Sequence, residues 1–170
     1  MDLKTKVRHV QDFPKSGIDF IDITPLLHDP EIFAYIIDRF SKELENIDFD
    51  FIACTEARGF IFGAPLAYKL KKGFIPVRKK GKLPAETISV TYDLEYGQDS
   101  LEIHADALKA GQKVVIIDDL LATGGTIQAS IDLFEKLGGK VQKILFLIEL
   151  EELKAMNKFK NHDVFVMEKL

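Results

Sequence analysis

The sequence predicts an α/β fold in which a mainly parallel sheet is flanked by helices. Short apolar runs typical of buried strands alternate along the chain with segments whose apolar residues recur at helical spacing. Such an alternation builds a parallel sheet with helices on both faces, joined by right-handed crossovers. The chain has 170 residues, a length at which about 70% of the unfolded surface is buried on folding. We therefore expect a single domain over residues 1–170.

The N-terminal part of the chain predicts two helices separated by a loop. A short helix is expected over residues 2–10, where the apolar residues lie about one helical turn apart: Leu3, Val7 and Val10. A loop with proline and glycine follows. The second helix is expected to begin at Asp29 and Pro30, which suit an N-cap and a first-turn proline, and its apolar residues repeat through Leu44.

The middle of the chain predicts two strands, a helix between them, and a hairpin. The apolar runs 51–55 and 73–77 are typical of buried strands, and residues 60–70 suit a helix. Residues 78–84 are basic and contain glycine and proline, so we expect an exposed loop there. The two strands of the hairpin, which interrupts the alternation, are expected at residues 87–94 and 100–103.

The C-terminal part of the chain predicts a strand, a helix and two more strands. Residues 114–117 form a β-branched run, and residues 126–137 form a helix that ends at Gly138 and Gly139. One face of this helix carries Ile127, Ile131 and Phe134. The last strands are expected at residues 141–150 and 164–166.

The composition restricts the kind of partner. Lysine and arginine number 23 against 27 aspartates and glutamates, a formal net charge of −4. This balance argues against binding to nucleic acid or to an anionic membrane through bulk charge, so small molecules are the expected partners. Cys54 is the only cysteine, which excludes an internal disulfide and fits a reducing compartment. With no signal-peptide core and no membrane-length apolar window, we expect a cytoplasmic protein.

The segment 114–126 carries the clearest chemical signal. A buried strand ends in Asp118 and Asp119, and a short glycine loop then opens a helix. Unpaired N–H groups and the helix dipole attract an anion to such a helix N-terminus. Glycines let the backbone approach that anion closely, and threonine hydroxyls can donate to it. The loop therefore predicts a phosphate site, and the two carboxylates suggest a sugar phosphate: Ala122, Thr123, Gly124, Gly125 and Thr126.

Other meanings of this segment are weaker. It is not a P-loop, because no lysine follows the glycines, and the chain contains no G-x-G-x-x-G. The remaining alternative is that Asp118 and Asp119 only end a strand and that Gly124 and Gly125 only form a tight turn. That alternative requires the two acids and the glycine loop to be adjacent by chance, although they form one continuous segment.

The segment 114–126 resembles the phosphoribosyl pyrophosphate motif of the type I phosphoribosyltransferases, in which hydrophobic residues precede two acids and a threonine-glycine-glycine-threonine loop. Further segments resemble the adenine phosphoribosyltransferase family more narrowly and follow the order of that family over almost the whole chain: residues 13–14, 17–20, 22–27, 56–60, 76–79, 81–84 and 92–97. Together these matches are specific, whereas each alone would be weak.

The resemblance implies a Mg²⁺-dependent reaction in which adenine and phosphoribosyl pyrophosphate give AMP and pyrophosphate. It implies that Mg²⁺ is held mainly by substrate and water, with no direct protein ligand. It also implies a homodimer, an N-terminal hood over residues 1–28 that binds the base, and a flexible loop and hairpin over residues 78–103.

The resemblance also assigns roles to residues. It places the sugar phosphate on residues 122–126 and the ribose hydroxyls near Asp118 and Asp119. It assigns pyrophosphate to two segments: Glu56, Ala57, Arg58 and Gly59, and Arg78, Lys79 and Lys82. Three of these residues are also expected to be catalytic: Arg58, Arg78 and Lys82. The alternative for these cations is a helix-start arginine paired with a surface acid and a merely solvated loop.

For the base, the resemblance assigns stacking to Phe20 and cover of the opposite face to Leu150, and it places Glu95 at the N7 edge for proton transfer. Asp19 and Ile21 complete the expected adenine site. The chain departs from the family at Ile21, where arginine is common, and at Ser16, where proline is common. If main-chain groups read the base there, selectivity for adenine survives the change. The alternatives for the two side chains are that Glu95 is a turn-exposed glutamate and that Phe20 is an ordinary core residue.

Two alternative functions remain open at this point. Another purine could be the acceptor, such as hypoxanthine, guanine or xanthine. Alternatively, the chain could be a nucleotide-sensing regulator that keeps the fold, although such regulators carry an added DNA-binding domain and have no need of the loop cations.

Overall fold

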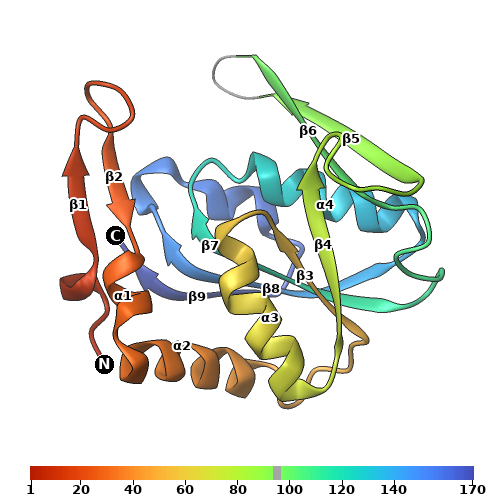
Figure 1. Ribbon diagram of the computed structural model, residues 1–170, viewed down its shortest axis with the longest axis horizontal. Coiled ribbons are helices and arrows are strands. Elements are labelled where there is room, and N and C mark those ends of the chain that lie inside the picture. Colours follow the sequence, from red (N-terminus) through yellow and green to blue (C-terminus); the bar gives the residue numbers. More distant parts are fainter. Residues whose placement is uncertain (94–96) are drawn as a thin grey trace.

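A seven-stranded, mainly parallel sheet forms the centre of the protein in the computed structural model, which describes residues 1–93 and 97–170. Its order is β5-β6-β4-β3-β7-β8-β9, and β4, β3, β7, β8 and β9 are parallel, while β6 and β5 continue the sheet antiparallel at one edge (Figure 1). The predicted α/β fold is confirmed. The strands are β3 (Phe51–Thr55), β4 (Gly73–Lys79), β5 (Thr87–Asp93), β6 (Gln98–His104), β7 (Lys113–Leu121), β8 (Lys140–Glu149) and β9 (Val164–Lys169).

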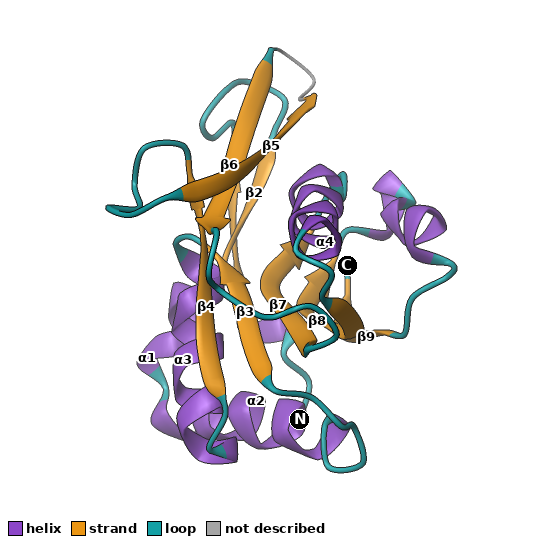
Figure 2. Ribbon diagram, turned by 90° about the vertical axis from the view of Figure 1, so that its right-hand side faces the viewer, coloured by secondary structure: helices purple, strands orange, loops and turns teal. Residues whose placement is uncertain are grey.

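Helices cover both faces of the sheet. On one face lie α1 (Thr24–His28), α2 (Pro30–Glu43) and α3 (Arg58–Leu70), and on the other lies α4 (Gly125–Lys136) (Figure 2). The buried apolar residues accordingly form two clusters, because strand side chains alternate between faces. Phe40 and Phe62 pack under α2 and α3, and Phe134 packs under α4.

The N-terminal residues form a hairpin, so the prediction of a helix over residues 2–10 is wrong. A single 3₁₀ turn, η1 (Lys4–Lys6), precedes β1 (Arg8–Gln11), which pairs antiparallel with β2 (Asp19–Asp22). Pairing between the two strands satisfies the hydrogen-bonding needs of every second backbone amide. A helix would gain little from its apolar face, because Leu3 is the only one of its three apolar residues that is buried.

Several boundaries also differ from the sequence-based expectations. β4 extends through Lys79, so Arg78 and Lys79 belong to a strand and the predicted loop begins later. β7 continues through Leu121, because the backbone from Asp118 to Leu121 still pairs with β8. The hairpin of β5 and β6 is confirmed, and α1 was not predicted.

This architecture leaves two hairpins beside one edge of the sheet. In Figure 1, the β1–β2 hairpin and the β5–β6 hairpin stand at opposite ends of the side toward which β4 points. Parallel strands bring their carboxyl ends to the same edge, where open α/β sheets bind ligands. The phosphate loop, which we define as residues 122–126, lies there because it follows β7 directly.

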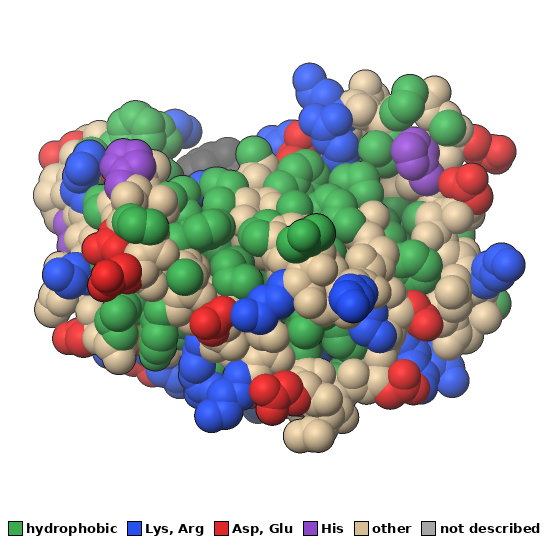
Figure 3. Space-filling model, turned by 60° about the horizontal axis from the view of Figure 1, so that its bottom comes forward, with side chains coloured by type: hydrophobic (Ala, Val, Ile, Leu, Met, Phe, Trp, Pro, Cys, Tyr) green, Lys and Arg blue, Asp and Glu red, His purple; other side chains and the backbone are tan. Residues whose placement is uncertain are grey.

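The surface carries an apolar area on one face. Hydrophobic side chains gather in the middle of the face that carries α2 and α3 (Figure 3), and Ile61 and Tyr68 of α3 are exposed, Tyr68 to 89%. Among the described residues, no helix is both long enough and apolar enough to cross a membrane.

Candidate active site

The phosphate loop leaves the N-terminus of α4 open. Gly124 precedes the helix with φ of +81°, a left-handed conformation that favours glycine, and no side chain caps the first turn. The N–H groups of this turn are therefore available to a ligand. At the far side of the loop, the Tyr92 hydroxyl lies 3.4 Å from the Thr126 hydroxyl, so β5 contacts the loop as well.

Two buried carboxylates precede the loop, with Asp118 exposed to 8% and Asp119 to 4%. The Thr55 hydroxyl donates to Asp118 Oδ2 at 2.6 Å, and the Asp119 N–H donates to Asp118 Oδ1 at 3.0 Å. Burial, followed by the negative charge of Asp119, raises the pKa of Asp118 to about 7. Burial also raises the pKa of Asp119, although the Arg58 guanidinium opposes that shift.

Arg58 links three of the predicted subsites. It begins α3, and its Nε lies 2.9 Å from Asp119 Oδ2. The same oxygen is buried and has no hydrogen-bond partner of good geometry among the described residues. The guanidinium carbon lies 5.4 Å from the centre of the Phe20 ring, in a cation–π contact. Arg58 therefore joins the carboxylate pair to the N-terminal hairpin.

Glu56 holds the second group of cations. Its Oε2 accepts from Arg78 Nη2 at 2.9 Å and from Nε at 3.3 Å, while its Oε1 accepts from the Lys79 N–H at 2.6 Å. Arg78 also donates to the Lys82 carbonyl at 3.2 Å. Burial opposes ionisation of Glu56, yet the Lys79 N–H and the Arg78 guanidinium hold the pKa of this carboxyl below its ordinary value. The two segments assigned to pyrophosphate are thus connected directly.

The residues assigned to adenine lie on the N-terminal hairpin and after β8. Phe20 is half-buried on β2 and meets the Phe13 ring edge-on at 5.2 Å. The Asp19 carboxylate contacts His9 Nδ1 at 2.7 Å, and Ile21 is buried, so only the backbone of Ile21 is available to a ligand. Leu150 directly follows β8 and packs against the same core cluster that contains Ile21.

The comparisons with known proteins agree with this geometry. The family model described as phosphoribosyl transferase domain matches residues 23–169. Adenine phosphoribosyltransferase of Ruminiclostridium cellulolyticum is 61% identical over 165 residues, covering 96% of each chain. That of Acetivibrio thermocellus is 58% identical over 165 residues, again covering 96% of each. The chain belongs to the adenine phosphoribosyltransferase family.

Solved structures of the family have the same fold. The crystal structure of adenine phosphoribosyltransferase from Thermoanaerobacter pseudethanolicus matches with a TM-score of 0.95 at 58% identity, covering 99% of this chain and 98% of that one. The enzyme from Saccharomyces cerevisiae, crystallised with D-2,5-dideoxy-2,5-imino-altritol 1,6-bisphosphate and adenine, matches with a TM-score of 0.92 at 41% identity, covering 97% and 96%. A phosphoribosyltransferase fold is therefore shown for this chain.

One expected site residue is not described by the structure, and two residues near the site were not predicted. Glu95, expected at the N7 edge of the purine, lies outside the described residues, so its role stays a prediction. Thr55 and Glu102 were missed by sequence reasoning. Thr55 holds Asp118, and the buried Glu102 accepts from the Gly81 N–H at 2.9 Å. Glu102 faces the pyrophosphate segment only because β6 pairs with β4, a contact that no local pattern reveals.

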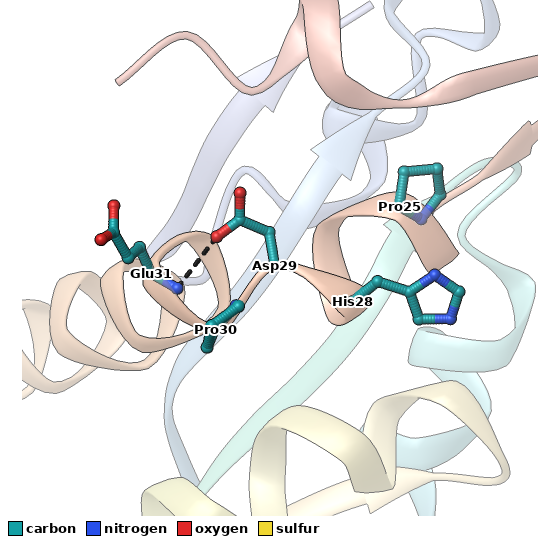
Figure 4. Close-up of a pocket in the computed structure, with 5 residues that line it drawn as sticks. All are labelled: Pro25, His28, Asp29, Pro30 and Glu31. Carbon is teal, nitrogen blue, oxygen red and sulfur yellow. Dashed lines mark hydrogen bonds between the residues drawn. The ribbon is translucent and has the colours of Figure 1, made fainter.

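An open depression elsewhere on the surface is not part of this site. It lies where α1 meets α2 and is lined by residues of neither the phosphate loop nor the cation cluster: Pro25, His28, Asp29, Pro30 and Glu31 (Figure 4). Its geometry follows from the start of α2, where Asp29 Oδ1 accepts from the Glu31 N–H at 3.0 Å and from the Ile32 N–H at 3.2 Å. These bonds confirm the predicted N-cap.

Proposed function

We propose that the protein joins adenine to the anomeric carbon of phosphoribosyl pyrophosphate and releases pyrophosphate, which gives AMP in a purine-salvage reaction. The observation that carries the proposal is a helix N-terminus left open directly after the two buried carboxylates Asp118 and Asp119. Adenine as acceptor is supported by relatives of that name at 61% and 58% identity over nearly the whole chain.

The phosphate loop would bind the 5-phosphate of the sugar. Its amides at the start of α4 and the hydroxyls of Thr123 and Thr126 supply donors. Asp118 and Asp119 would accept from the ribose hydroxyls, because both lie on β7 just before the phosphate loop.

The cations would stabilise the departing pyrophosphate. As the bond between the anomeric carbon and pyrophosphate breaks, the sugar becomes oxocarbenium-like and negative charge gathers on the leaving group. Arg58 and the backbone of residues 56–59 would hold this group from one side, with Arg78, Lys79 and Lys82 on the other. The bond from adenine nitrogen forms on the opposite face of the carbon, with inversion.

The residues present fit a Mg²⁺ ion that is held by substrate and water. Asp118 and Asp119 can accept from water molecules of a hydrated ion. When bound, Mg²⁺ would neutralise pyrophosphate and ribose oxygens.

The adenine would lie between Phe20 and Leu150, with the backbone of residues 19–21 reading its edge. An aromatic ring on one face and an aliphatic side chain on the other suit a flat purine. The buried side chain of Ile21 supports main-chain recognition, because it directs no polar group at the base. Glu95 is proposed to transfer a proton at the purine N7 edge, which requires a raised pKa near neutrality.

The test compares four purines as acceptors. Purified protein is given phosphoribosyl pyrophosphate and Mg²⁺ with adenine, hypoxanthine, guanine or xanthine, and nucleotide and pyrophosphate are measured. We expect AMP to form fastest, and equal or better turnover with hypoxanthine would refute adenine as the acceptor. Charge reversal by Asp118→Lys with Asp119→Lys should abolish synthesis, and retained activity would refute their role. Glu95→Gln should lower the single-turnover rate more than sugar-phosphate binding.

The assembly is proposed to be a homodimer in the cytoplasm. The exposed apolar side chains of Ile61 and Tyr68, both on α3, support a second copy of the chain as partner, because exposed apolar surface is where proteins associate. The buried, free thiol of Cys54 fits a reducing compartment. Light scattering should give twice the chain mass, and Tyr68→Glu should reduce it to one chain.

A further inference from the structure

The connection between β8 and β9 packs against the phosphate loop, although no motif in the sequence assigns it a role. It contains the 3₁₀ turns η2 (Glu151–Leu153) and η3 (Ala155–Phe159). Phe159 is 1% exposed. A Cβ atom built on Gly124 would lie 2.9 and 3.0 Å from two atoms of the Phe159 ring and 3.6 Å from Ala155 Cβ. The ring therefore fills the space on one side of Gly124.

A lysine of the same turn fixes the peptide group next to Gly124. Lys158 Nζ donates to the Thr123 carbonyl at 2.7 Å from an exposed side chain. In a planar trans peptide, the carbonyl of Thr123 and the N–H of Gly124 point in opposite directions. Because the Thr123 carbonyl faces η3, the Gly124 N–H faces away from η3.

The orientation of this peptide needs such a restraint. Gly124 has φ of +81°, but glycine adopts negative φ about as readily, so the peptide between Thr123 and Gly124 can rotate at little backbone cost. After that rotation the Thr123 carbonyl would face the ligand, and its negative end would repel a phosphate. A charge-assisted hydrogen bond from Lys158 favours the orientation that binds, and it polarises the peptide so that Gly124 donates more strongly.

We propose that Lys158 is a positioning residue for the phosphate loop: it holds the Thr123 carbonyl so that the Gly124 N–H is set in advance to receive the 5-phosphate of the sugar. This inference rests on the proposed function, which supplies the sugar phosphate. Lys158 acts through the backbone and touches neither the reacting carbon nor the base.

The test compares Lys158→Met, Lys158→Arg and the matched control Lys160→Met. Lys160 lies two positions away and is also exposed, and its side chain makes no hydrogen bond or ion pair with any residue that the structure describes. Calorimetric titration measures the Kd of ribose 5-phosphate, and steady-state kinetics measure KM for both substrates and kcat. Because loss of one hydrogen bond from a charged donor weakens binding about tenfold, we expect this rise in Kd and in KM for phosphoribosyl pyrophosphate for Lys158→Met.

The other readouts separate positioning from a merely structural role. We expect kcat and KM for adenine to be unchanged in Lys158→Met. The variant loses binding of the sugar phosphate equally in the ground state and in the transition state. Lys158→Arg should restore the Kd, and Lys160→Met should leave it unchanged. Thermal denaturation should show that all variants remain folded at the assay temperature, so that a rise in Kd does not reflect unfolding.

An unchanged Kd of ribose 5-phosphate for Lys158→Met would overturn the inference, and so would two further results. Equal weakening by Lys158→Met and Lys160→Met would show that only general positive charge matters, and an equal rise in KM for adenine would show a general structural effect. The proposed function fails by a different result, in which the wild-type protein forms no AMP. In that case the titration with ribose 5-phosphate still tests Lys158.

Discussion

The buried carboxylate of Asp118 should make the stability of the protein depend on pH, and Asp118→Asn should remove that dependence. Asparagine has the same size and keeps an oxygen for the N–H of Asp119. Its amide group can donate to the Thr55 oxygen in place of the present bond from the Thr55 hydroxyl. The substitution therefore removes a titrating group while it preserves the local packing.

The sign follows from the raised pKa. The folded protein keeps the proton of Asp118 up to about pH 7, whereas the unfolded chain loses it near the ordinary value of 3.8. The unfolded state binds fewer protons between these values, so the free energy of unfolding falls as the pH rises through this window. At 1.36 kcal/mol for each unit, the full effect is about 4 kcal/mol, of which about 3 kcal/mol falls between pH 5 and pH 8.

Urea denaturation of wild-type protein and Asp118→Asn at pH 5, 6, 7 and 8 measures this effect. The free energy of unfolding of the variant, minus that of the wild type, should rise by about 3 kcal/mol over this range. Titrating groups distant from Asp118 are common to both proteins and cancel in the difference, whereas Asp119, which interacts with Asp118, does not cancel fully. Parallel pH profiles for the two proteins would refute the claim that burial holds Asp118 protonated.

Three further substitutions test other parts of the structure. Glu56→Gln removes the charge that orients Arg78 and should raise KM for phosphoribosyl pyrophosphate about fivefold; an unchanged KM in steady-state kinetics would contradict this role. Gly63→Ala places a Cβ 1.9 Å from Cys54 Sγ and should cost about 1 to 3 kcal/mol in urea denaturation; adding Cys54→Ala should recover most of it, and no recovery would locate the strain elsewhere. Asp29→Ala removes two N-cap hydrogen bonds and should cost about 1 kcal/mol; an unshifted Tm would show that the cap contributes nothing.

The sequence predicts elements whose signals are local. The helix after Asp29 is an example, because its cap, its first-turn proline and the spacing of its apolar residues all act within one segment. The N-terminal hairpin could not be predicted in this way. The spacing of Leu3, Val7 and Val10 is helical, and only the pairing of β1 with β2 decides the conformation.

The same distinction applies to the candidate site. The carboxylate pair and the phosphate loop form one continuous segment, so their chemistry is visible in the sequence. The contact of Glu56 with Arg78 joins residues 22 positions apart, and that of Lys158 with Thr123 joins residues 35 positions apart. Such contacts depend on which strands become neighbours, and no periodicity in the chain encodes them.

The acidic residues beside the segments assigned to pyrophosphate position the neighbouring cations more than they stabilise the fold. Arg78 with Glu56 and Lys79 with Asp99 are partly exposed pairs, with the cations exposed to 33% and 60%. Pairs of this kind contribute about 0.2 to 1 kcal/mol to folding. Holding a long side chain in place before binding avoids an entropic cost of about 0.5 to 1.5 kcal/mol when the ligand arrives. In the proposed reaction the carboxylates would therefore improve binding of pyrophosphate although they share its charge, because the cations that would meet it are already ordered.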